Sequence, residues 1–335
     1  MRVLAQEKKA ILLDKKDWRI LQESVKNVRQ PLSQIAKECQ LSRQSVEYRL
    51  QQMEKNQLLI GSRAVVNIRA LGYSSYHVFL EVRTPEQEKE LIKRAVAAPF
   101  VNALLVYSGK FNLEISLMVK STEEFLAKYH LLVEGLALRD EHILVLQQTL
   151  CNEVLPQRYF PLEKEKRREE KILAKKDKRK AYAPDERDLR LLFLLSRDAR
   201  RTNNDLAREL KLSKDAIKYR IRKLEEQKIL VQYRPVVNYA ALGLTVNTLL
   251  VKLNYTAKAA AAFEVLLRST DTILWATRTF GYYDYIIYVL TKNVEEFHEV
   301  INQMKSQFAE SIKTYEVLSA FEELKYFFMA EEMGK

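Results

Sequence analysis

Cysteine, glycine and proline are scarce in this chain of 335 residues, which has 2, 7 and 7 of them. Cys39 and Cys151 lie too far apart for a zinc-binding pair, and two cysteines make no disulfide framework. The few glycines include no glycine-rich phosphate-binding loop. No apolar run reaches the ~18–20 residues of a membrane span, and the first residues do not resemble a secretory signal. We therefore expect a cytoplasmic protein with no metal, no cofactor and no membrane partner.

Positive charge is in excess, with 56 Lys and Arg against 44 Asp and Glu and a formal net charge of +12. Such a balance favours a polyanionic partner, although a basic enzyme fits the same composition. Hydrophobic residues make up 47% of the chain and charged residues 30%, as in globular proteins. At roughly 100–200 residues per domain, the length predicts at least two domains.

The sequence repeats itself at an offset of 171 residues. Asp14–Gly72 aligns with Asp185–Gly243 without a gap, and 20 of the 59 positions are identical. The resemblance weakens beyond Gly72 but continues at an offset of 172, where Gly109 aligns with Gly281. This self-similarity indicates a tandem duplication. Between the copies, Glu163–Lys180 holds ten basic and five acidic residues, which we interpret as a tether or as an extra phosphate-contacting strip.

Each copy begins with a pattern typical of three short helices. In the second copy, Asp185 precedes an apolar face, a second helix is predicted near Asn204–Leu210, and Ser213 caps a third helix that ends near Glu226. Two helices joined by so short a turn form a helix-turn-helix (HTH), whose second helix enters the DNA major groove. The β-rich residues that follow the third helix in each copy are long enough for a small two-stranded wing.

The rest of each copy predicts strand, helix, strand, strand, helix, strand. This βαββαβ order is that of the ferredoxin-like fold. The strands are expected near 76–83, 101–107, 113–119 and 143–149 in the first copy and near 248–255, 273–280, 285–290 and 314–319 in the second. The helices are expected near 86–97, 122–138, 258–268 and 294–308.

An HTH followed by a βαββαβ module resembles the Lrp/AsnC family of feast/famine transcriptional regulators. Leu41–Glu54 and Leu212–Glu225 are similar to the recognition helix of that family, and Gly281–Tyr285 is similar to its Gly-x-x-Asp-Tyr turn. The first copy departs from that turn, since Asn112 and Leu113 replace Asp and Tyr. Members of the family carry one copy and dimerise, so the resemblance implies a dimer fused into one chain. The exposed sheets of such modules also permit a homodimer of whole chains.

The fold class is therefore predicted as α+β, with two winged HTH domains alternating with two ferredoxin-like βαββαβ domains. The predicted ranges are winged HTH 1 at 1–62, ferredoxin-like domain 1 at 63–160, basic linker at 161–183, winged HTH 2 at 184–233 and ferredoxin-like domain 2 at 234–335.

The residues after Ser42 and Ser213 are expected to face double-stranded DNA. Arg and Lys can pair with guanine or phosphate, Gln with adenine, and Tyr with phosphate. The predicted DNA-binding residues are Ser42, Arg43, Gln44, Ser45, Tyr48, Arg49, Ser213, Lys214, Asp215, Lys218, Tyr219 and Arg222. Alternatively, these charges form an ordinary solvated helix surface. Because the two sets differ, we expect a quasi-palindromic or asymmetric DNA site.

The βαββαβ modules have two interpretations. They either serve only to pair with each other, or they also bind a small effector, which the family resemblance implies to be an amino acid. By that resemblance, the effector-binding residues are Gly281, Tyr283, Asp284, Gly109 and Asn112. Gly281 would allow close approach of the backbone, and Asp284 would pair with an ammonium group.

Two other functions remain open. Some proteins of this architecture are sirohaem decarboxylases, whose chemistry requires histidine and arginine near an anionic macrocycle; His77 and Arg278 are the candidates, although no catalytic dyad can be recognised. The other alternative is a protein-binding scaffold, which the positive charge disfavours. The sequence favours a transcriptional regulator and not an enzyme, with no catalytic residues predicted.

Overall fold

The computed structural model describes residues 2–3, 10–160, 182–254 and 256–334. The basic segment Glu163–Lys180 lies outside the described residues. No described helix is long and apolar enough to cross a membrane.

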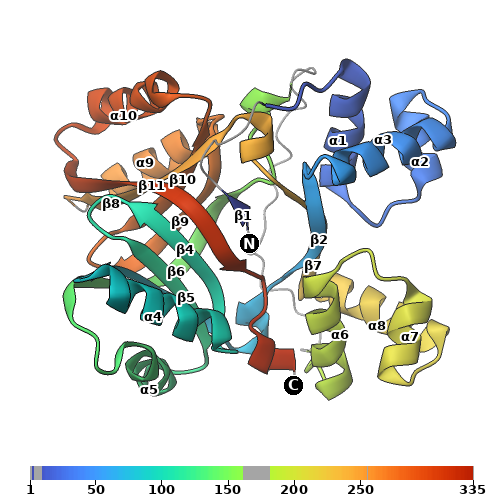
Figure 1. Ribbon diagram of the computed structural model, residues 1–335, viewed down its shortest axis with the longest axis horizontal. Helices are drawn as coiled ribbons and strands as arrows, with labels where there is room; N and C mark the ends of the chain where they lie inside the picture. The colour runs from blue at the N-terminus through green and yellow to red at the C-terminus, as the bar shows by residue number, and fades with distance from the viewer. Residues whose placement is uncertain (1, 4–9, 161–181, 255, 335) are drawn as a thin grey trace.

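Two HTH units lie on one side of the molecule and a β-barrel on the other (Figure 1). The first unit, HTH1, consists of α1 (Lys15–Lys26), α2 (Leu32–Cys39) and α3 (Arg43–Lys55). The second, HTH2, consists of α6 (Glu186–Arg197), α7 (Asn203–Leu210) and α8 (Lys214–Glu226). The predicted helices are therefore present in both copies, at the same offset of 171 residues.

The same local interactions begin the two units. Asp14 and Asp185 each form a capping box with the residue three positions later, Asp17 or Asp188. The tight turn before the third helix requires a left-handed residue, and Gln40 and Lys211 adopt it with φ of 55° and 52°.

The wing in the structure differs from the predicted one. We predicted a two-stranded wing within each copy, but each copy contributes one strand, and β2 (Leu59–Val66) pairs with β7 (Leu230–Val237). The pairing is antiparallel, with Arg63 opposite Arg234. Eight continuous residues leave no room for a turn and a second strand, so each strand obtains its hydrogen bonds from the other copy.

The two βαββαβ modules have the predicted order of elements. Module 1 consists of β3 (Ser74–Val82), α4 (Pro85–Ala97), β4 (Val101–Ser108), β5 (Leu113–Val119), α5 (Thr122–Val133) and β6 (Leu138–Asn152). Module 2 consists of β8 (Thr245–Leu253), α9 (Ala257–Ser269), β9 (Ile273–Gly281), β10 (Tyr285–Thr291), α10 (Val294–Phe308) and β11 (Ile312–Tyr326). The last strands, β6 and β11, are much longer than the stretches predicted for them.

These long strands close the barrel. The first part of β6 pairs with β3 of its own module, and the second part pairs with β9 of module 2. In the same way, β11 pairs with β8 and then with β4 of module 1. The strand order is β11-β4-β5-β3-β6-β9-β10-β8, and β8 returns to β11, so eight antiparallel strands form a closed ring. The short strand β1 (Arg2–Val3) adds to β11.

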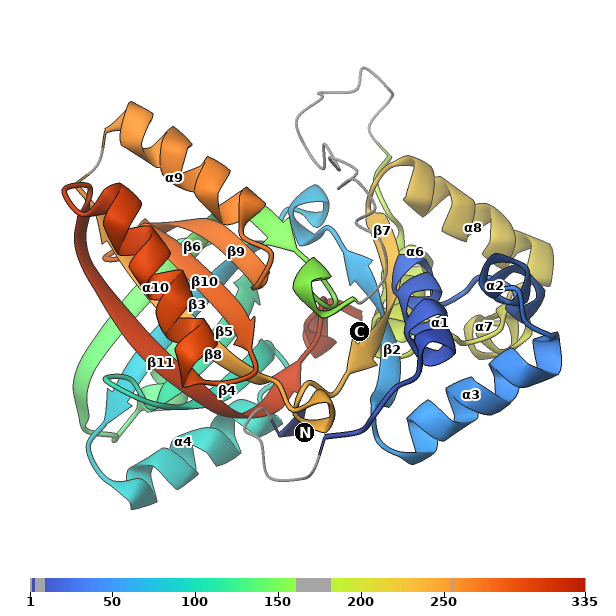
Figure 2. The same cartoon turned by 90° about the horizontal axis from the view of Figure 1, so that it is seen from above.

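Helices α4, α5, α9 and α10 cover the outside of the barrel (Figures 1 and 2). Strands alternate their side chains, so one set packs under these helices and the other fills the barrel. In module 1 the outer set includes Val78 and Leu80, which pack with Phe125 of α5. In module 2 it includes Val251 and Ile287, which pack with Phe263 of α9. The inner set includes Phe79, Leu105, Leu250 and Leu318.

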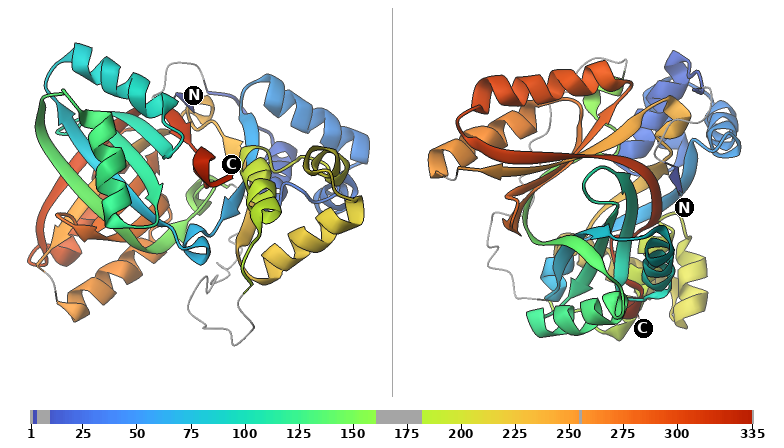
Figure 3. Two further views of the ribbon diagram at one scale, coloured as in Figure 1. Left: turned by 90° about the horizontal axis from the view of Figure 1, so that it is seen from below. Right: turned by 60° about the vertical axis from the view of Figure 1, so that its left-hand side comes forward.

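The two copies cross over between their HTH units and their βαββαβ modules. Because β2 and β7 run in opposite directions past each other, HTH1 lies beside module 2 and HTH2 lies beside module 1 (Figure 1). Ile11 N–H donates to the Ala241 carbonyl at 2.8 Å. The terminal turn η4 (Glu331–Gly334) packs on α6, in the junction between barrel and HTH units (Figure 3).

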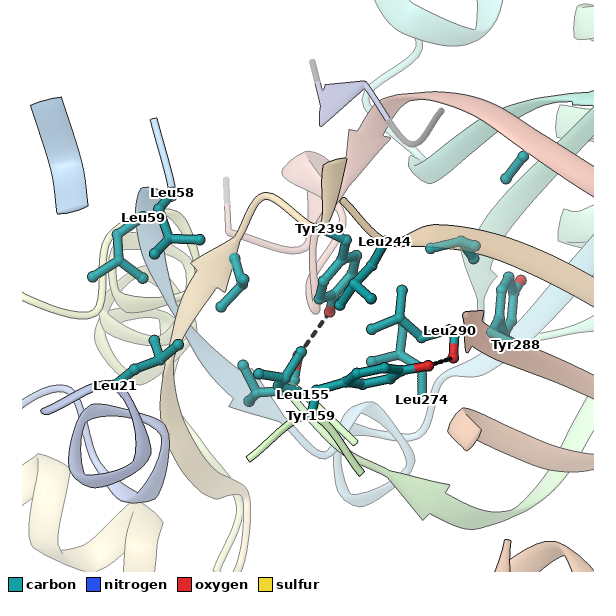
Figure 4. Packing of buried hydrophobic residues seen from close by; sticks show 14 of the residues in the cluster. Leu21, Leu58, Leu59, Leu155, Tyr159, Tyr239, Leu244, Leu274, Tyr288 and Leu290 are labelled. Carbon is teal, nitrogen blue, oxygen red and sulfur yellow. Dashed lines mark hydrogen bonds between the residues drawn. The ribbon is translucent and has the colours of Figure 1, made fainter. Parts of the chain in front are cut away.

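An unbroken apolar cluster joins HTH1 to the barrel interior. Figure 4 shows this joint, where Tyr239 donates to the Val154 carbonyl at 2.8 Å and Tyr159 to the Leu290 carbonyl at 2.5 Å. The residues drawn include Leu21, Leu58, Leu59, Leu155, Tyr159, Tyr239, Leu244, Leu274, Tyr288 and Leu290. HTH2 has a separate cluster that includes Leu191, Ile217 and Met333.

Candidate functional site

The two reader helices, α3 and α8, begin at capped serines. Ser42 Oγ accepts from Ser45 N–H and Ser213 Oγ from Ala216 N–H, both at 3.1 Å. Each cap fixes the start of the helix, where unpaired N–H groups and the helix dipole favour an anion. The first turn of each reader helix is therefore an electropositive surface suited to a phosphate backbone.

The predicted DNA-facing side chains project into solvent. Tyr48 and Tyr219 are 62% and 55% exposed, unusual values for large aromatic side chains. The other predicted residues classed as exposed are Ser42, Arg43, Gln44, Ser213, Lys214, Asp215, Lys218 and Arg222, and Ser45 is partly buried. Asp215 lies 3.7 Å from Lys218 on the same helix. Among the residues that the structure describes, none covers either reader helix along this surface.

Arg49 occupies a different position from the other predicted DNA contacts. Its guanidinium donates to Asp14 at 2.8 Å and to Asp17 at 2.6 Å, the two carboxylates of the α1 capping box. Arg220 makes the equivalent bonds to Asp185 and Asp188 in HTH2. These pairs fasten the reader helix to the first helix of its unit, so the guanidinium of Arg49 is engaged in positioning α3.

Hydrogen bonds between the two units hold the reader helices relative to each other. Arg29 of HTH1 donates to the carbonyls of Ala199 and Arg201 at 2.8 and 2.9 Å and to the side chain of Asn203 at 2.8 Å. Arg200 of HTH2 pairs in turn with Glu54 of α3. These contacts were not predicted from the sequence. The one signal for them was that Arg29 and Arg200 are identical residues at aligned positions of the repeat.

The reader helices lie on either side of the paired HTH units and slope toward each other away from the barrel (Figure 2). The C-terminal end of each reader helix leads into β2 or β7 beside the barrel. The N-terminal end of each reader helix is therefore the end farther from the barrel. Between the units lies a cavity of about 730 Å³, whose lining includes Leu32, Leu50 and Lys214.

The two glycines predicted to line an effector site lie where one module contacts the other. Gly281 has φ of 150°, and a Cβ added there would collide with the carbonyl oxygen of Ile143 in β6. Gly109 has φ of 142°, and its Cβ would lie 2.8 Å from the carbonyl oxygen of Val317 in β11. Both glycines therefore permit close approach between modules.

Asp284 and Asn112 take equivalent positions in the two modules. Asp284 Oδ2 accepts from Leu253 N–H at 2.8 Å, and Asn112 Oδ1 accepts from Val82 N–H at 2.9 Å. Each side chain thus bonds the last residue of the first strand of its module. The exchange of Asp for Asn preserves this acceptor, which explains why the first copy can depart from the family pattern.

Tyr283 is buried at the same seam. Its ring lies 5.4 Å from that of His142 in an edge-to-face arrangement, and the His142 ring stacks on Tyr282 at 4.4 Å. Burial lowers the pKa of His142 and raises that of Tyr283. The five predicted effector residues form two groups, one at each seam between the modules.

His77, the histidine considered for catalysis, belongs to a polar network inside the barrel. The carboxylate of Glu114, fully buried, accepts from His77 Nδ1 at 2.6 Å, Tyr107 at 2.5 Å and Tyr288 at 2.6 Å. Burial, reinforced by the Glu114 charge, raises the pKa of both tyrosines. Tyr288 belongs to module 2, so the network joins the modules through the barrel interior.

The other residues considered for catalysis do not join this network. Arg278 pairs with Glu264 at 3.4 Å outside the barrel. The chain's other histidines outside the seam, His130 and His298, are exposed on α5 and α10. The sequence analysis did not predict a role for Glu114, although an acidic residue within the otherwise apolar strand 113–119 is a signal of a buried polar site. In the repeat it aligns with Ile286, so the network is a feature of one copy only.

Removing the Glu114 carboxylate should destabilise the protein strongly. In Glu114→Ala, His77, Tyr107 and Tyr288 lose their shared acceptor inside the barrel, and breaking a buried pair costs about 3–5 kcal/mol. Glu81→Ala is the matched control, because Glu81 forms a solvent-exposed pair with Arg139 worth under ~1 kcal/mol. Denaturant unfolding measures the free energy of unfolding of both variants. Equal decreases in the two variants would contradict a role for the network.

Gly281→Ala should cost more stability than Gly61→Ala. The two glycines have nearly the same φ, 150° at Gly281 and 153° at Gly61, but a Cβ at Gly61 meets nothing within 4 Å. Backbone strain of about 1–3 kcal/mol is common to both variants, and the contact with β6 is added only at Gly281. Thermal unfolding gives the comparison, and equal shifts would show that the close approach carries no cost.

Comparison with known proteins finds family matches for three segments of the chain. Residues 13–54 match the AsnC-type helix-turn-helix domain, residues 184–231 a winged helix-turn-helix DNA-binding domain, and residues 248–327 the Lrp/AsnC ligand binding domain. The chain is 31% identical over 124 residues to the proline dehydrogenase transcriptional activator of Rhodobacter capsulatus, covering 36% of this chain and 80% of that protein.

Two further similarities bear on the architecture. The HTH-type transcriptional regulator LrpC of Bacillus subtilis is 28% identical over 130 residues, which cover 38% of this chain and 88% of LrpC. The crystal structure of the siroheme decarboxylase NirDL covers 96% of both chains with a TM-score of 0.63 and 16% identity, which relates the folds alone. The sequence matches and their coverage place the chain in the Lrp/AsnC family of transcriptional regulators.

Proposed function

We propose that the protein is a sequence-specific regulator that binds double-stranded DNA with both reader helices of one chain. The observation that carries this proposal is the exposure of the same surface on α3 and α8, each capped by a serine and each left uncovered by the residues that the structure describes. The DNA-binding and transcription-regulation assignments of the matched family support it.

We infer that the chain arose by tandem duplication and works as an intrachain dimer. The repeat of 20 identities in 59 positions and the recurrence of the HTH helices, the wing strand and the βαββαβ elements support this inference. The barrel pairs each module with the other through β6–β9 and β11–β4. Those strands are therefore occupied, and a homodimer of whole chains would use another surface.

Differences between the reader helices predict an asymmetric DNA site. Tyr48 and Tyr219 are identical, but Arg43, Gln44 and Glu47 of α3 are replaced in α8 by Lys214, Asp215 and Lys218. The half-sites should lie about one helical turn, ~34–36 Å, or a multiple apart. Selection from a random pool of duplexes should enrich quasi-palindromes, and enrichment of perfect palindromes alone would contradict the proposal.

Arg43→Ala and Lys214→Ala should each weaken DNA binding, with sequence preference relaxed if the side chain reads a base. Wild-type affinity should fall steeply with salt, by ~10³–10⁵ between 50 and 200 mM for six to ten phosphate contacts. Fluorescence anisotropy with labelled duplex measures both effects. Arg139→Ala, an exposed arginine of β6 on the barrel, is the control and should bind normally. Unchanged binding in both reader variants would remove α3 and α8 as the DNA contacts.

We further propose that a small effector modulates DNA binding through the modules. The match of residues 248–327 to a ligand binding domain supports this, because the turn Gly281–Tyr285 lies within it. An effector acts only through its difference in affinity for two arrangements of the modules. Since Asp284 bonds the backbone of Leu253, a ligand ammonium would share that carboxylate with an N–H donor.

A sirohaem-decarboxylase-like activity is the second candidate. Its support is the shared arrangement with NirDL, a siroheme decarboxylase, over 96% of both chains. Against it, His77 is held inside the barrel by Glu114 and Ser116.

Titration of the purified protein with sirohaem tests the second candidate. The regulator proposal predicts no saturable shift of the Soret band at stoichiometric protein. A saturable shift that His77→Ala abolishes, together with salt-insensitive DNA binding, would favour the enzyme over the regulator.

A further inference from the structure

The backbones of the two HTH units meet across an approximate two-fold axis. At the centre of the β2–β7 pairing, aligned residues of the repeat lie opposite each other. Val28 N–H donates to the Tyr233 carbonyl at 3.0 Å, and the equivalent bond joins Ala199 N–H to the Ser62 carbonyl at 3.3 Å. A contact between the units could therefore occur twice, once from each copy.

Two arginines at aligned positions, Arg29 and Arg200, break this symmetry. Their backbones are held alike, since each N–H donates to the side chain two residues earlier at 2.8 or 2.9 Å. The Arg29 guanidinium donates to the carbonyls of Ala199 and Arg201 at 2.8 and 2.9 Å. The Arg200 guanidinium pairs with Glu54 of α3 instead of the equivalent carbonyls of HTH1. Arg29 is half-buried in its contact, whereas Arg200 is exposed.

The two arginines compete for one place. Arg29 binds the carbonyls on either side of Arg200, and the equivalent contact would take Arg200 to the carbonyls on either side of Arg29. Two guanidinium groups would then lie between the same two loops, where their like charges repel. One arginine therefore occupies the crossing position, and the other needs a different partner, which Glu54 provides.

Two differences between the copies favour Arg29 in the crossing position. Asn203 Oδ1 accepts from the Arg29 guanidinium at 2.8 Å, whereas the aligned residue of HTH1 is Leu32, which offers no acceptor to the competing arginine. The guanidinium also lies over the Tyr233 ring, 5.3 Å from its centroid, and the aligned residue of HTH1 is Ser62, which has no ring. The sequences of the two copies thus select one of two possible arrangements.

The crossing contact joins the supports of the two reader helices. The loop that Arg29 binds leads directly into α7, whose first residue is Asn203, and α7 packs on α8. On the other side, Arg29 lies between α1 and α2 of HTH1, and α2 packs on α3. The position of α8 relative to α3 therefore depends on which arginine crosses.

We propose that Arg29 is a positioning residue that holds the two HTH units in one asymmetric arrangement and so fixes the spacing of the DNA half-sites that one chain binds. The part that concerns DNA rests on the proposed function, whereas the part that concerns the reader helices does not.

Distances between spin labels on the free protein test the arrangement. Labels at Gln44 and Asp215, exposed and aligned residues of α3 and α8, report the separation of the reader helices once the two cysteines are replaced. Arg29→Gln should broaden a distribution that is narrow in wild type, because the crossing contact is lost. Arg201→Gln is the matched control, since it removes an arginine of the same loop that pairs within HTH2, with Glu209, and it should leave the distribution narrow.

Two further variants separate geometry from charge. Arg29→Lys keeps the charge but loses the planar fork that reaches three acceptors, so it should also broaden the distribution. Asn203→Leu removes one acceptor and leaves Arg29 in place, so it should broaden the distribution less and decides the question if Arg29→Gln does not fold. Circular dichroism identifies the folded variants. Distributions as narrow as wild type in all folded Arg29 and Asn203 variants would overturn the proposal, and so would equal broadening in Arg201→Gln.

Duplexes enriched from the random pool test the consequence for half-site spacing. Inserting one or two base pairs between the half-sites should weaken wild-type binding, because each added base pair also rotates a half-site by about 35° on a turn of roughly 10–10.5 base pairs. In Arg29→Gln this penalty should shrink by roughly tenfold, equivalent to about 1.4 kcal/mol, and Arg201→Gln should retain it. An unchanged penalty in Arg29→Gln would overturn the role in spacing. If wild type enriches no duplex, the regulator proposal fails, while the spin-label distances still decide the role of Arg29.

Discussion

Backbone hydrogen bonds between the two copies of the repeat are the constraint on which the structure depends. The wing strand of each copy pairs with that of the other, β2 with β7, and the last strand of each module pairs with the other module, β6 with β9 and β11 with β4. A strand left unpaired would present buried N–H and C=O groups. Each copy is thus incomplete alone, and the position of one reader helix is set by the fold of the other copy.

Within this shared frame the copies have diverged in their side chains. The buried charge inside the barrel belongs to module 1 alone, where the Glu114 carboxylate accepts hydrogen bonds from donors of both modules. The reader helices also differ in charge and polarity. A dimer of identical chains would carry every such feature twice, whereas a fused chain allows each copy to keep a backbone contact and change its chemistry. Asn112 and Asp284 illustrate this, since both bond the end of a first strand.

Local patterns in the sequence were sufficient to predict the helices, the capping serines and the order of the strands. These depend on residues close together, such as Ser42 with Ser45 or Asp14 with Asp17. The partner of each wing strand was predicted wrongly, because a run of eight β-rich residues does not show which strand will pair with it. The role of Arg49 was missed for a similar reason, as its partners Asp14 and Asp17 are more than thirty residues away. Contacts between copies depend on the tertiary fold, which the periodicity of the sequence does not encode.

The proposed regulator requires one chain to hold two reader helices at a fixed separation. Spin labels on cysteines placed at Tyr48 and Tyr219, exposed aromatic residues of α3 and α8, measure this separation once the buried thiols of Cys39 and Cys151 are replaced. Pulsed electron paramagnetic resonance should give one narrow distribution of distances that does not change with protein concentration. A broad distribution, or a distance that appears only at high concentration, would show that the separation is not set within the chain.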